Sequence, residues 1–246
     1  MIRIILIVIF SYFLTACGPA TDEIDPTLSM SVKQLYASAR NELKKGNYQT
    51  AIEQFETLES RFPFGNYATQ AQLDVAYTYY KYDEHEAAIA AAERFIKLNP
   101  RHKSVDYAYY LKGLVNFNRG GTILDKLQDR DMADYDRELL QNSYDDFKSL
   151  IIRFPESEYV EDSKQRILFL RNELARLDIK IVEYYASREA WVAVAQRTRF
   201  ILENYQGTDV IKDALDYQLK AYTELKLDDL AEDTRRVIEL NYSKNS

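Results

Sequence analysis

Apolar residues recur with helical spacing along most of the chain from residue 32 onward. Short polar turns separate the apolar runs, and Pro63, Pro100 and Pro155 each follow one of these runs. Proline interrupts a helix because it has no backbone N–H and restricts the residue before it. The pattern therefore predicts a protein made of helices that are joined by short turns.

The prolines mark a repeat. The segments LESRFPFGNYATQA, FIKLNPRHKSVDYA and LIIRFPESEYVEDS share the order apolar run, proline, polar turn and next helix. Pro63 and Pro100 lie 37 residues apart, and Tyr205 and Tyr242 stand at the proline position of two further units with the same spacing. The two intervening spacings, 55 and 50 residues, are longer, so these units contain insertions.

Small and aromatic residues occupy matching positions where two antiparallel helices would touch. These positions are Ala39, Ala51 and Phe55 in the first unit, Ala76, Ala88 and Phe95 in the second, and Gly113 and Phe147 in the third. The pattern is typical of tetratricopeptide repeats, which have a usual period of about 34 residues. Such helix pairs stack because one pair cannot bury its apolar face alone. We expect an all-α tetratricopeptide-repeat superhelix of about five helix-turn-helix units, and an irregular helical bundle is the alternative.

Two segments depart from the repeat. Residues 118–139 are charged and begin near Gly120 and Gly121, which predicts a long surface loop that is a candidate for contact with a partner. After Pro155 no glycine or proline occurs until Gly207, which predicts a helix of about 28 residues. Its apolar residues have heptad spacing, which favours a seam packed inside the solenoid over pairing with a partner helix. The seam consists of Ile167, Leu170, Leu174, Leu177, Ile181 and Tyr184.

The N-terminus has the organisation of an export signal. Arg3 precedes the apolar run of residues 4–14, which is too short to cross a bilayer as a permanent helix. The run ends in LTAC at Cys17, the only cysteine, and resembles a bacterial lipobox. We predict a lipoprotein signal peptide over residues 1–16 and acylation of Cys17, for example by palmitate; the alternative is an ordinary signal peptide and a chance cysteine. The resemblance to bacterial lipoproteins implies the outer membrane, because Gly18 stands where an aspartate would favour retention in the inner membrane.

The remaining chain divides into a tether and two groups of repeats. Residues 17–30 are poor in large apolar groups and predict a flexible tether. Ser31 and Gln34 have the spacing of a capping box, so the first helix is expected to begin directly after the tether. N-terminal repeats 1–3 are assigned to residues 31–155 and C-terminal repeats 4–5 to residues 156–246.

Composition argues against several classes of function. The net charge of −7 is unfavourable for binding nucleic acid, whose phosphates require clustered basic residues. His85 and His102 have no cysteine or histidine at metal-ligand spacing, and the sequence shows no nucleophile motif or glycine-rich phosphate loop. We therefore expect no metal, no cofactor and no enzymatic activity.

Tyrosine is unusually abundant, with 20 residues, and clusters on the first helices of the units. Counting from the Ala and Gly packing positions places eight side chains in the concave groove: Tyr36, Arg40, Leu73, Tyr77, Tyr80, Tyr107, Tyr110 and Phe117. A tyrosine ring is rigid and apolar with a polar tip, which suits binding of an extended peptide with aromatic side chains. The alternative is that these rings belong to the core, as we expect for Tyr79 and Tyr109.

Several segments resemble the BamD family, the tetratricopeptide lipoproteins of the outer-membrane β-barrel assembly machinery (BAM complex). They are RFPFGNYATQAQLDVAYTYYK (61–81), RFIKLNPRH (94–102), DYAYYLKGL (106–114), DRD (129–131), RILFLRNELA (166–175) and VEYYASREAWVAV (182–194). The resemblance runs in order over almost the whole predicted mature chain. It departs from the commonest form of the family at Asn66, where a proline is often found.

The resemblance implies an outer-membrane protein assembly factor on the periplasmic face of the outer membrane. Its N-terminal repeats would receive unfolded outer-membrane proteins, and its C-terminal repeats would hold the barrel-forming subunit BamA through a POTRA domain. Accessory BAM lipoproteins would be further partners. The implied substrate-peptide site consists of Phe62, Pro63, Phe64, Gly65, Tyr67, Tyr77 and Tyr80. The implied partner site consists of Trp191, which is as consistent with the core, and Arg197, whose replacement by glutamate is expected to leave folding intact.

Without the resemblance, the residues indicate only a lipid-anchored helical-repeat scaffold. Other lipoproteins of this type act as pilotins for secretins, as adaptors in envelope constriction or as regulators of peptidoglycan synthesis. A hydrolase with a hidden acid in a cleft is an alternative from a different class.

Overall fold

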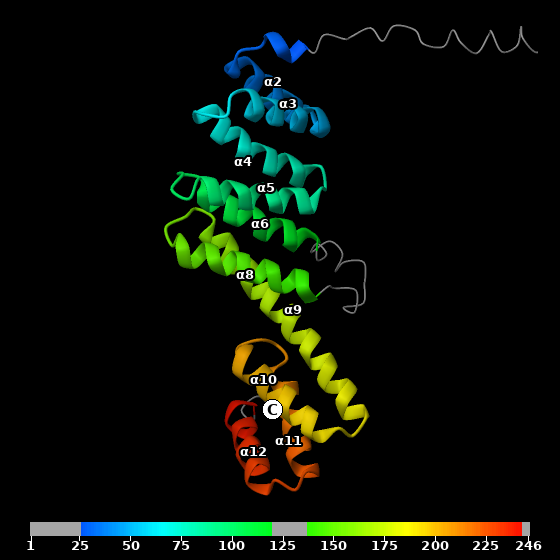
Figure 1. Ribbon diagram of the computed structural model, residues 1–246. Coiled ribbons are helices and arrows are strands. Elements are labelled where there is room, and N and C mark those ends of the chain that lie inside the picture. Colours follow the sequence, from blue (N-terminus) through cyan, green and yellow to red (C-terminus); the bar gives the residue numbers. More distant parts are fainter. Residues whose placement is uncertain (1–25, 120–136, 243–246) are drawn as a thin grey trace, which may run out of the picture.

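The computed structural model describes residues 26–119 and 137–242, and this part of the chain consists of helices joined by turns (Figure 1). A short 3-10 helix, Pro26–Ser29, precedes the α-helices. The α-helices are α2 (Val32–Lys45), α3 (Tyr48–Arg61), α4 (Asn66–Lys81), α5 (His85–Leu98), α6 (Val105–Arg119), α8 (Arg137–Arg153), α9 (Val160–Ser187), α10 (Trp191–Asn204), α11 (Ile211–Glu224) and α12 (Asp228–Tyr242).

Helices that follow one another in the chain pack side by side (Figure 1). The described residues form five pairs of packed helices, namely α2–α3, α4–α5, α6–α8, α9–α10 and α11–α12, and the segment between α6 and α8 lies outside the described residues. The second helix of each unit also packs against the first helix of the next, so the units stack in one continuous array. The predicted all-α tetratricopeptide-repeat superhelix of about five units is confirmed.

Local sequence explains both ends of α2. The hydroxyl of Ser31 accepts the backbone N–H of Gln34 at 3.4 Å, and the Gln34 side chain accepts the N–H of Ser31 at 3.0 Å. The predicted capping box is therefore confirmed. At the other end, Gly46 has a φ of 81° and donates its N–H to the carbonyl of Leu43. Glycine takes this left-handed conformation without steric cost.

The small residues predicted at helix contacts are buried. Their exposed fractions are 0% for Ala39, Ala51, Ala76 and Ala88, and at most 1% for Phe55, Phe95 and Phe147. The tightest approach is at Gly113 on α6, where an added Cβ would lie 2.6 Å from the Phe147 ring of α8. These contacts allow the backbones of paired helices to approach closely.

Replacing Gly113 by alanine is expected to lower the free energy of unfolding by about 1–3 kcal/mol, because the methyl group forces α6 away from Phe147. Urea denaturation followed by circular dichroism measures the change. Asn142→Ala, on an exposed position of α8, is the control and should shift it by at most about 0.5 kcal/mol. Equal midpoints for both variants would contradict the close packing of α6 on α8.

Helix α9 has the 28 residues that the sequence predicted. In the predicted seam, Leu170 and Leu174 are buried, but Tyr184 is 57% exposed. The heptad seam is therefore wrong toward the C-terminal end, where Ile179 and Val182 are the buried residues. The helix packs against α8 and also against α10 and α11, so it buries more than one face along its length.

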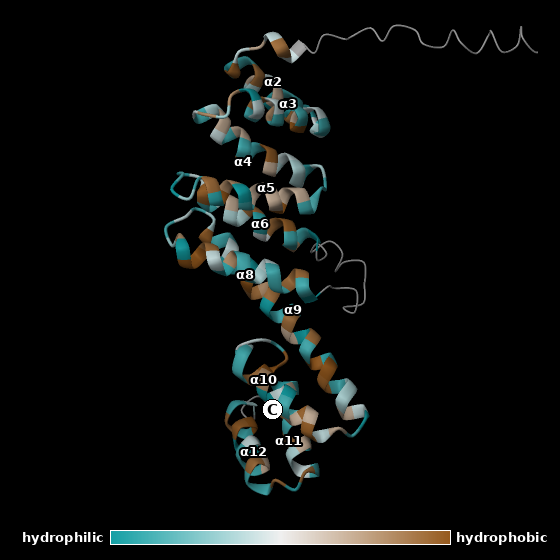
Figure 2. Cartoon of the chain, in the orientation of Figure 1, coloured by the Kyte–Doolittle hydropathy of each residue, from teal (hydrophilic) through white to brown (hydrophobic). Residues whose placement is uncertain are grey.

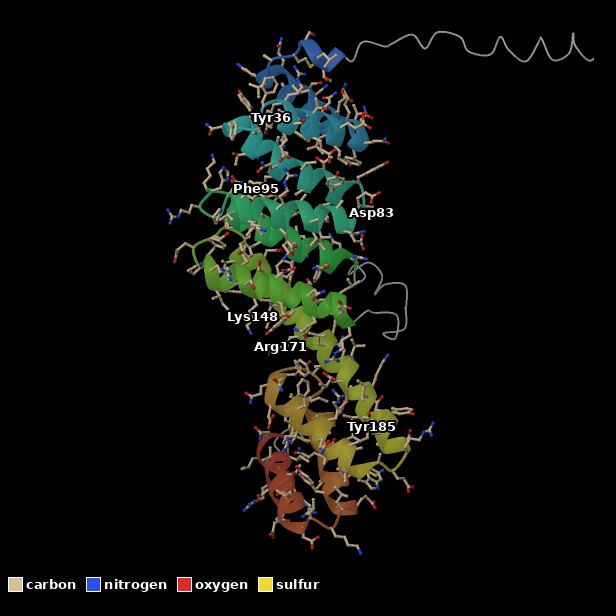
Figure 3. All side chains as sticks on the ribbon, in the orientation of Figure 1. Tyr36, Asp83, Phe95, Lys148, Arg171 and Tyr185 are labelled. Atoms are coloured by element: carbon tan, nitrogen blue, oxygen red, sulfur yellow. The ribbon has the colours of Figure 1, made fainter. Side chains whose placement is uncertain are left out.

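The apolar core continues across the predicted division at residue 155, which falls in the turn between α8 and α9. One cluster of buried side chains includes Phe117 and Phe147 on the N-terminal side and Val194 and Ile201 on the C-terminal side. The Phe117 ring of α6 lies 5.5 Å from the Phe169 ring of α9, which is a direct contact across the division. Within the C-terminal repeats, Arg171 of α9 (labelled in Figure 3) donates to the carbonyl of Gln206 at 2.6 Å. The assigned boundary therefore separates repeats without interrupting the core.

The first described residues pack on the folded body. Arg61 donates to the carbonyl oxygens of Thr27 and Leu28 at 2.6 and 2.9 Å, so the last part of the predicted 17–30 tether contacts α3. The predicted signal peptide, Cys17 and most of the predicted 118–139 loop lie outside the described residues.

Hydrophobic and hydrophilic residues are mixed along the helices in Figure 2, as expected for helices with one buried face. In the described ranges, none of the helices is long and apolar enough to cross a membrane.

Candidate functional site

A hollow of about 340 Å³ lies on the side of the array formed by the first helices of the units. It is bounded by α2, α4, α6 and the turn before α9. Four of the residues predicted to face the groove line this hollow: Arg40, Leu73, Tyr77 and Tyr107. The prediction that the first helices enclose a concave surface with tyrosine side chains thus agrees with the geometry.

One wall of the hollow is organised by Asp74, which is only 6% exposed. Its carboxylate accepts hydrogen bonds from the Tyr36 hydroxyl at 2.7 Å, from Arg40 at 3.2 Å and from Gln70 at 3.2 Å. Burial raises the pKa of Asp74, although Tyr36 and Arg40 oppose the shift. The carboxylate is thus fully used in holding Tyr36 and Arg40, and it does not form a free acid for catalysis.

Another part of the lining consists of Tyr107 and Tyr159, whose rings pack together with that of the neighbouring Tyr110. The Tyr159 ring lies 4.6 Å from that of Tyr110 and 5.5 Å from that of Tyr107. The Tyr110 hydroxyl donates to Asp162 at 2.7 Å, and burial together with this bond raises the pKa of Tyr110 to about 12. Burial also raises the pKa of Tyr107. The hydroxyl groups of Tyr107 and Tyr110 are therefore neutral, and packing against Tyr159 holds both rings in position.

Phe117 was predicted to face the groove, but it lies in the core. It is 5% exposed, its ring lies 5.5 Å from that of Phe169, and the Arg166 guanidinium covers it at 4.6 Å. Counting along α6 from Gly113 does not reveal that Phe147 of α8 and Phe169 of α9 cover this ring, so the prediction for Phe117 is wrong.

The predicted substrate-peptide residues are only partly brought together. Tyr77 and Tyr80 are neighbours on α4, with ring centroids 6.3 Å apart, and Tyr80 accepts a hydrogen bond from Asn118. Tyr67 is 37% exposed, and its ring lies 5.3 Å from that of Tyr36. These tyrosines belong to the same side of the array as the hollow.

The turn between α3 and α4 supplies the other predicted residues. Phe62 packs against the core of the first unit, whereas Phe64 is 91% exposed. Pro63 borders a different, polar hollow with Arg94 of α5. Gly65 precedes α4 with a φ of 100°, a conformation that favours glycine. The structure therefore divides this set between two surfaces.

Sequence reasoning missed the turn residues of the hollow. Lys103 and Ser104 precede α6, and Glu158 and Tyr159 precede α9. Turn residues have no helical periodicity, so counting along helices could not place them. The polar turns after Pro100 and Pro155 were the only signal that could have indicated them.

The predicted partner residues lie on α10. Trp191 is the first residue of this helix, packs against the core and has Lys220 over its ring at 5.1 Å. Arg197 donates to Asp178 of α9 at 3.2 Å, and the Asp178 side chain is fully buried. Because Arg197 is part of a buried ion pair, the expectation that Arg197→Glu leaves folding intact does not fit this geometry.

The two histidines have structural surroundings. His102 accepts the N–H of Ser104 and lies edge-on to Phe95, and His85 lies 3.5 Å from Asp83. The part of the chain that the structure describes contains no group of three or more His, Cys, Asp or Glu side chains placed to hold a metal ion.

The stacked helix pairs and the tyrosine-lined groove define a tetratricopeptide-type repeat protein. Residues 28–237 match the profile of YfiO, a family described as outer membrane lipoprotein. The chain belongs to this family. Two relatives, each named outer membrane protein assembly factor BamD, support the assignment. The relative from Neisseria gonorrhoeae is 41% identical over 100% of this chain and 93% of its own length. That from Vibrio cholerae is 39% identical over 85% of this chain and 86% of its own.

The names of these relatives are those of assembly factors, which supports the prediction that the chain is not an enzyme. Among solved structures, a kinesin light chain with TPR-like repeats covers 87% of this chain and 97% of its own at 13% identity. Its TM-score is 0.38, so this similarity adds nothing to the assignment of the fold.

Proposed function

We propose that the protein is an outer-membrane protein assembly factor that acts as a lipid-anchored scaffold. In this proposal, its groove receives unfolded β-barrel proteins and its C-terminal repeats couple them to the barrel-forming insertase subunit. Family membership and the names of the relatives support the general function. The observation that supports the binding role is the groove, where fixed tyrosine rings stand beside Arg40 and Lys103.

The chemistry of the groove suits an extended peptide with aromatic side chains. The rings of Tyr77 and Tyr107 offer apolar contact area, and Arg40 and Lys103 offer positive charge. A peptide that ends in an aromatic residue has both an aromatic ring and a terminal carboxylate, so the ring and the charge can be bound at once. Asp106 and Glu158 on the same surface disfavour a strongly acidic peptide.

Replacing both Tyr77 and Tyr80 by alanine is expected to weaken binding of such peptides at least about tenfold, because truncation of buried tyrosine anchors costs upwards of about 1–2 kcal/mol. Fluorescence anisotropy with a labelled peptide measures the affinity. Tyr82→Ala, at the exposed end of the same helix, is the control and should bind like the unchanged protein. Equal affinity for the double variant would assign these tyrosines to a structural role.

For the C-terminal repeats, we propose binding to a POTRA domain of the barrel-forming subunit BamA at the surface that includes Trp191 and Arg197. Accessory lipoproteins are proposed as further partners. The lipid on Cys17 would hold the protein on the periplasmic face of the outer membrane. Affinity purification from detergent-solubilised envelopes with a C-terminal tag tests this assignment. Recovery of a subunit with POTRA domains supports it, whereas recovery of a secretin or a cell-wall synthase would favour a pilotin or a synthesis regulator.

A further inference from the structure

Three parts of the chain meet at one buried carboxylate. Arg137, the first residue of α8, donates to both oxygens of Asp178 at 3.1 and 3.0 Å. Arg197 of α10 donates to one of these oxygens at 3.2 Å. Tyr205 lies near the same carboxylate, and burial together with the charge of Asp178 raises the pKa of Tyr205 to about 12. Asp178 of α9 therefore joins a residue of the third unit to the end of the fourth.

The charges of this cluster do not cancel. Two guanidinium groups face one carboxylate, so the cluster of Arg137, Asp178 and Arg197 has a net charge of +1. The Asp178 side chain is fully buried, whereas the side chains of Arg137 and Arg197 are 42% and 34% exposed. The carboxylate is thus enclosed, and the surplus positive charge is directed to the surface.

Both arginines keep unused donors. A guanidinium has five N–H groups; Asp178 takes two from Arg137 and one from Arg197. Within the described ranges, Asp178 is the one carboxylate in ion-pair contact with Arg197. Because Asp178 fixes both side chains, they are held ready for a further acceptor without the usual loss of side-chain entropy.

We infer that Arg137 is a second partner-binding residue beside Arg197, and that the two together bind a carboxylate side chain of the partner protein. Asp178 is the positioning residue for both. The inference rests on the proposed function, which assigns Arg197 to the partner surface. A surplus of one positive charge matches one carboxylate, and guanidinium groups bind carboxylates with directed, charge-assisted hydrogen bonds.

Binding of one carboxylate by both arginines would also affect the contact between two repeat units. Hydrogen bonds to Asp178 raise the pKa of Arg137, so this arginine stays charged at any pH the protein meets. A partner carboxylate that bridges Arg137 and Arg197 would contact α8 and α10 at once. It would thereby clamp the third unit to the fourth, which are joined in the chain by the turn between α8 and α9.

The test measures affinity of the full-length protein for a purified POTRA fragment of the barrel-forming subunit by calorimetry. Arg137→Gln and Arg197→Gln are each expected to weaken binding about tenfold. The double variant is expected to lose clearly less than the roughly hundredfold that independent effects would give, because both residues bind one carboxylate group. Arg199→Gln, on the exposed side of the same α10 helix, is the control and should bind normally. The difference between the unchanged protein and the single variants should shrink as salt is raised.

Circular dichroism shows whether each variant is folded. If a glutamine variant does not fold, the corresponding lysine variant keeps a charge beside Asp178 and is expected to fold but to bind more weakly, because lysine lacks the planar fork. Asp178→Asn, if folded, is expected to bind with a steeper salt dependence, since the cluster then has a net charge of +2. A merely structural role of Asp178 would not change this dependence.

The outcomes separate the two levels of the proposal. If Arg137→Gln binds normally and Arg197→Gln binds weakly, Arg137 is not a partner-binding residue, and the proposed function is unaffected. Normal binding by both variants would overturn the carboxylate site. Absence of binding by the unchanged protein would overturn the proposed partner itself, and the inference with it.

Discussion

Replacing Phe147 by alanine is expected to lower the free energy of unfolding by about 3–5 kcal/mol. The ring has no exposed surface and touches the backbone side of Gly113. Its centroid lies 5.9 Å from that of Tyr110 and 6.3 Å from that of Phe117. Because Phe147 belongs to the cluster that continues from α8 into α9 and α10, its removal leaves a cavity where the two groups of repeats join.

Urea denaturation followed at two wavelengths, far-ultraviolet for helix and near-ultraviolet for aromatic packing, measures this loss. Ile152→Ala is the matched control, because Ile152 lies on the same helix and is 69% exposed. It should change the unfolding free energy by no more than about 0.5 kcal/mol. A loss below about 1 kcal/mol for Phe147→Ala would mean that the surrounding helices close the cavity and that the junction is not rigidly packed.

The second prediction concerns Arg197. Its replacement by glutamate is expected to destabilise the fold by about 2–4 kcal/mol, because a second carboxylate would then face the buried Asp178. The net charge of the cluster changes from +1 to −1, and Arg137 alone cannot balance two carboxylates. Thermal unfolding gives the size of the effect, and Arg199→Glu on the same helix is the control, since that side chain is 68% exposed.

This prediction determines how association experiments with Arg197 are interpreted. A glutamate variant that associates poorly has lost both a partner contact and part of its stability, so it cannot identify an interface by itself. Equal melting temperatures for the Arg197→Glu and Arg199→Glu variants would show instead that Asp178 contributes little to the fold. The glutamine variants remain the direct test of binding, because they add no negative charge.

The helix pairs and their contacts were predictable because the determinants are local. Ala39, Gly113 and Phe147 stand at fixed offsets from a turn, and these offsets are the contacts between paired helices. The close contact of α6 with α8 at Gly113 requires a residue without a side chain, so a glycine at this position of the repeat indicates the contact. The stacked units follow from many such contacts between neighbours in the chain.

Only the groove residues that lie on helices could be predicted from the sequence. Tyr77 and Tyr107 were placed by helical periodicity, whereas Lys103 and Tyr159 come from turns that only the superhelical stacking brings together. The same periodicity placed Phe117 wrongly, because contacts with α8 and α9 decide that its ring is covered.

The buried ion cluster could not be predicted from residues that are neighbours in the chain. Asp178 lies 41 residues after Arg137 and 19 before Arg197. One signal was present, an aspartate between Leu177 and Ile179 on a helix with apolar character. A carboxylate in such a position is seldom buried without a partner, but the sequence does not say which cation supplies it.

Helix α9 sets the distance between the groove and the arginine cluster. Tyr159 at its start borders the groove that we propose binds peptides, and Asp178 on the same helix holds the arginine cluster. At a rise of about 1.5 Å per residue, these two positions are roughly 28 Å apart along the helix axis. An extended polypeptide covers that distance with about eight residues, somewhat fewer than the 9–11 of a membrane-spanning β-strand. Under the proposed function, a chain held by its end in the groove would reach the proposed partner surface within the length of a single strand.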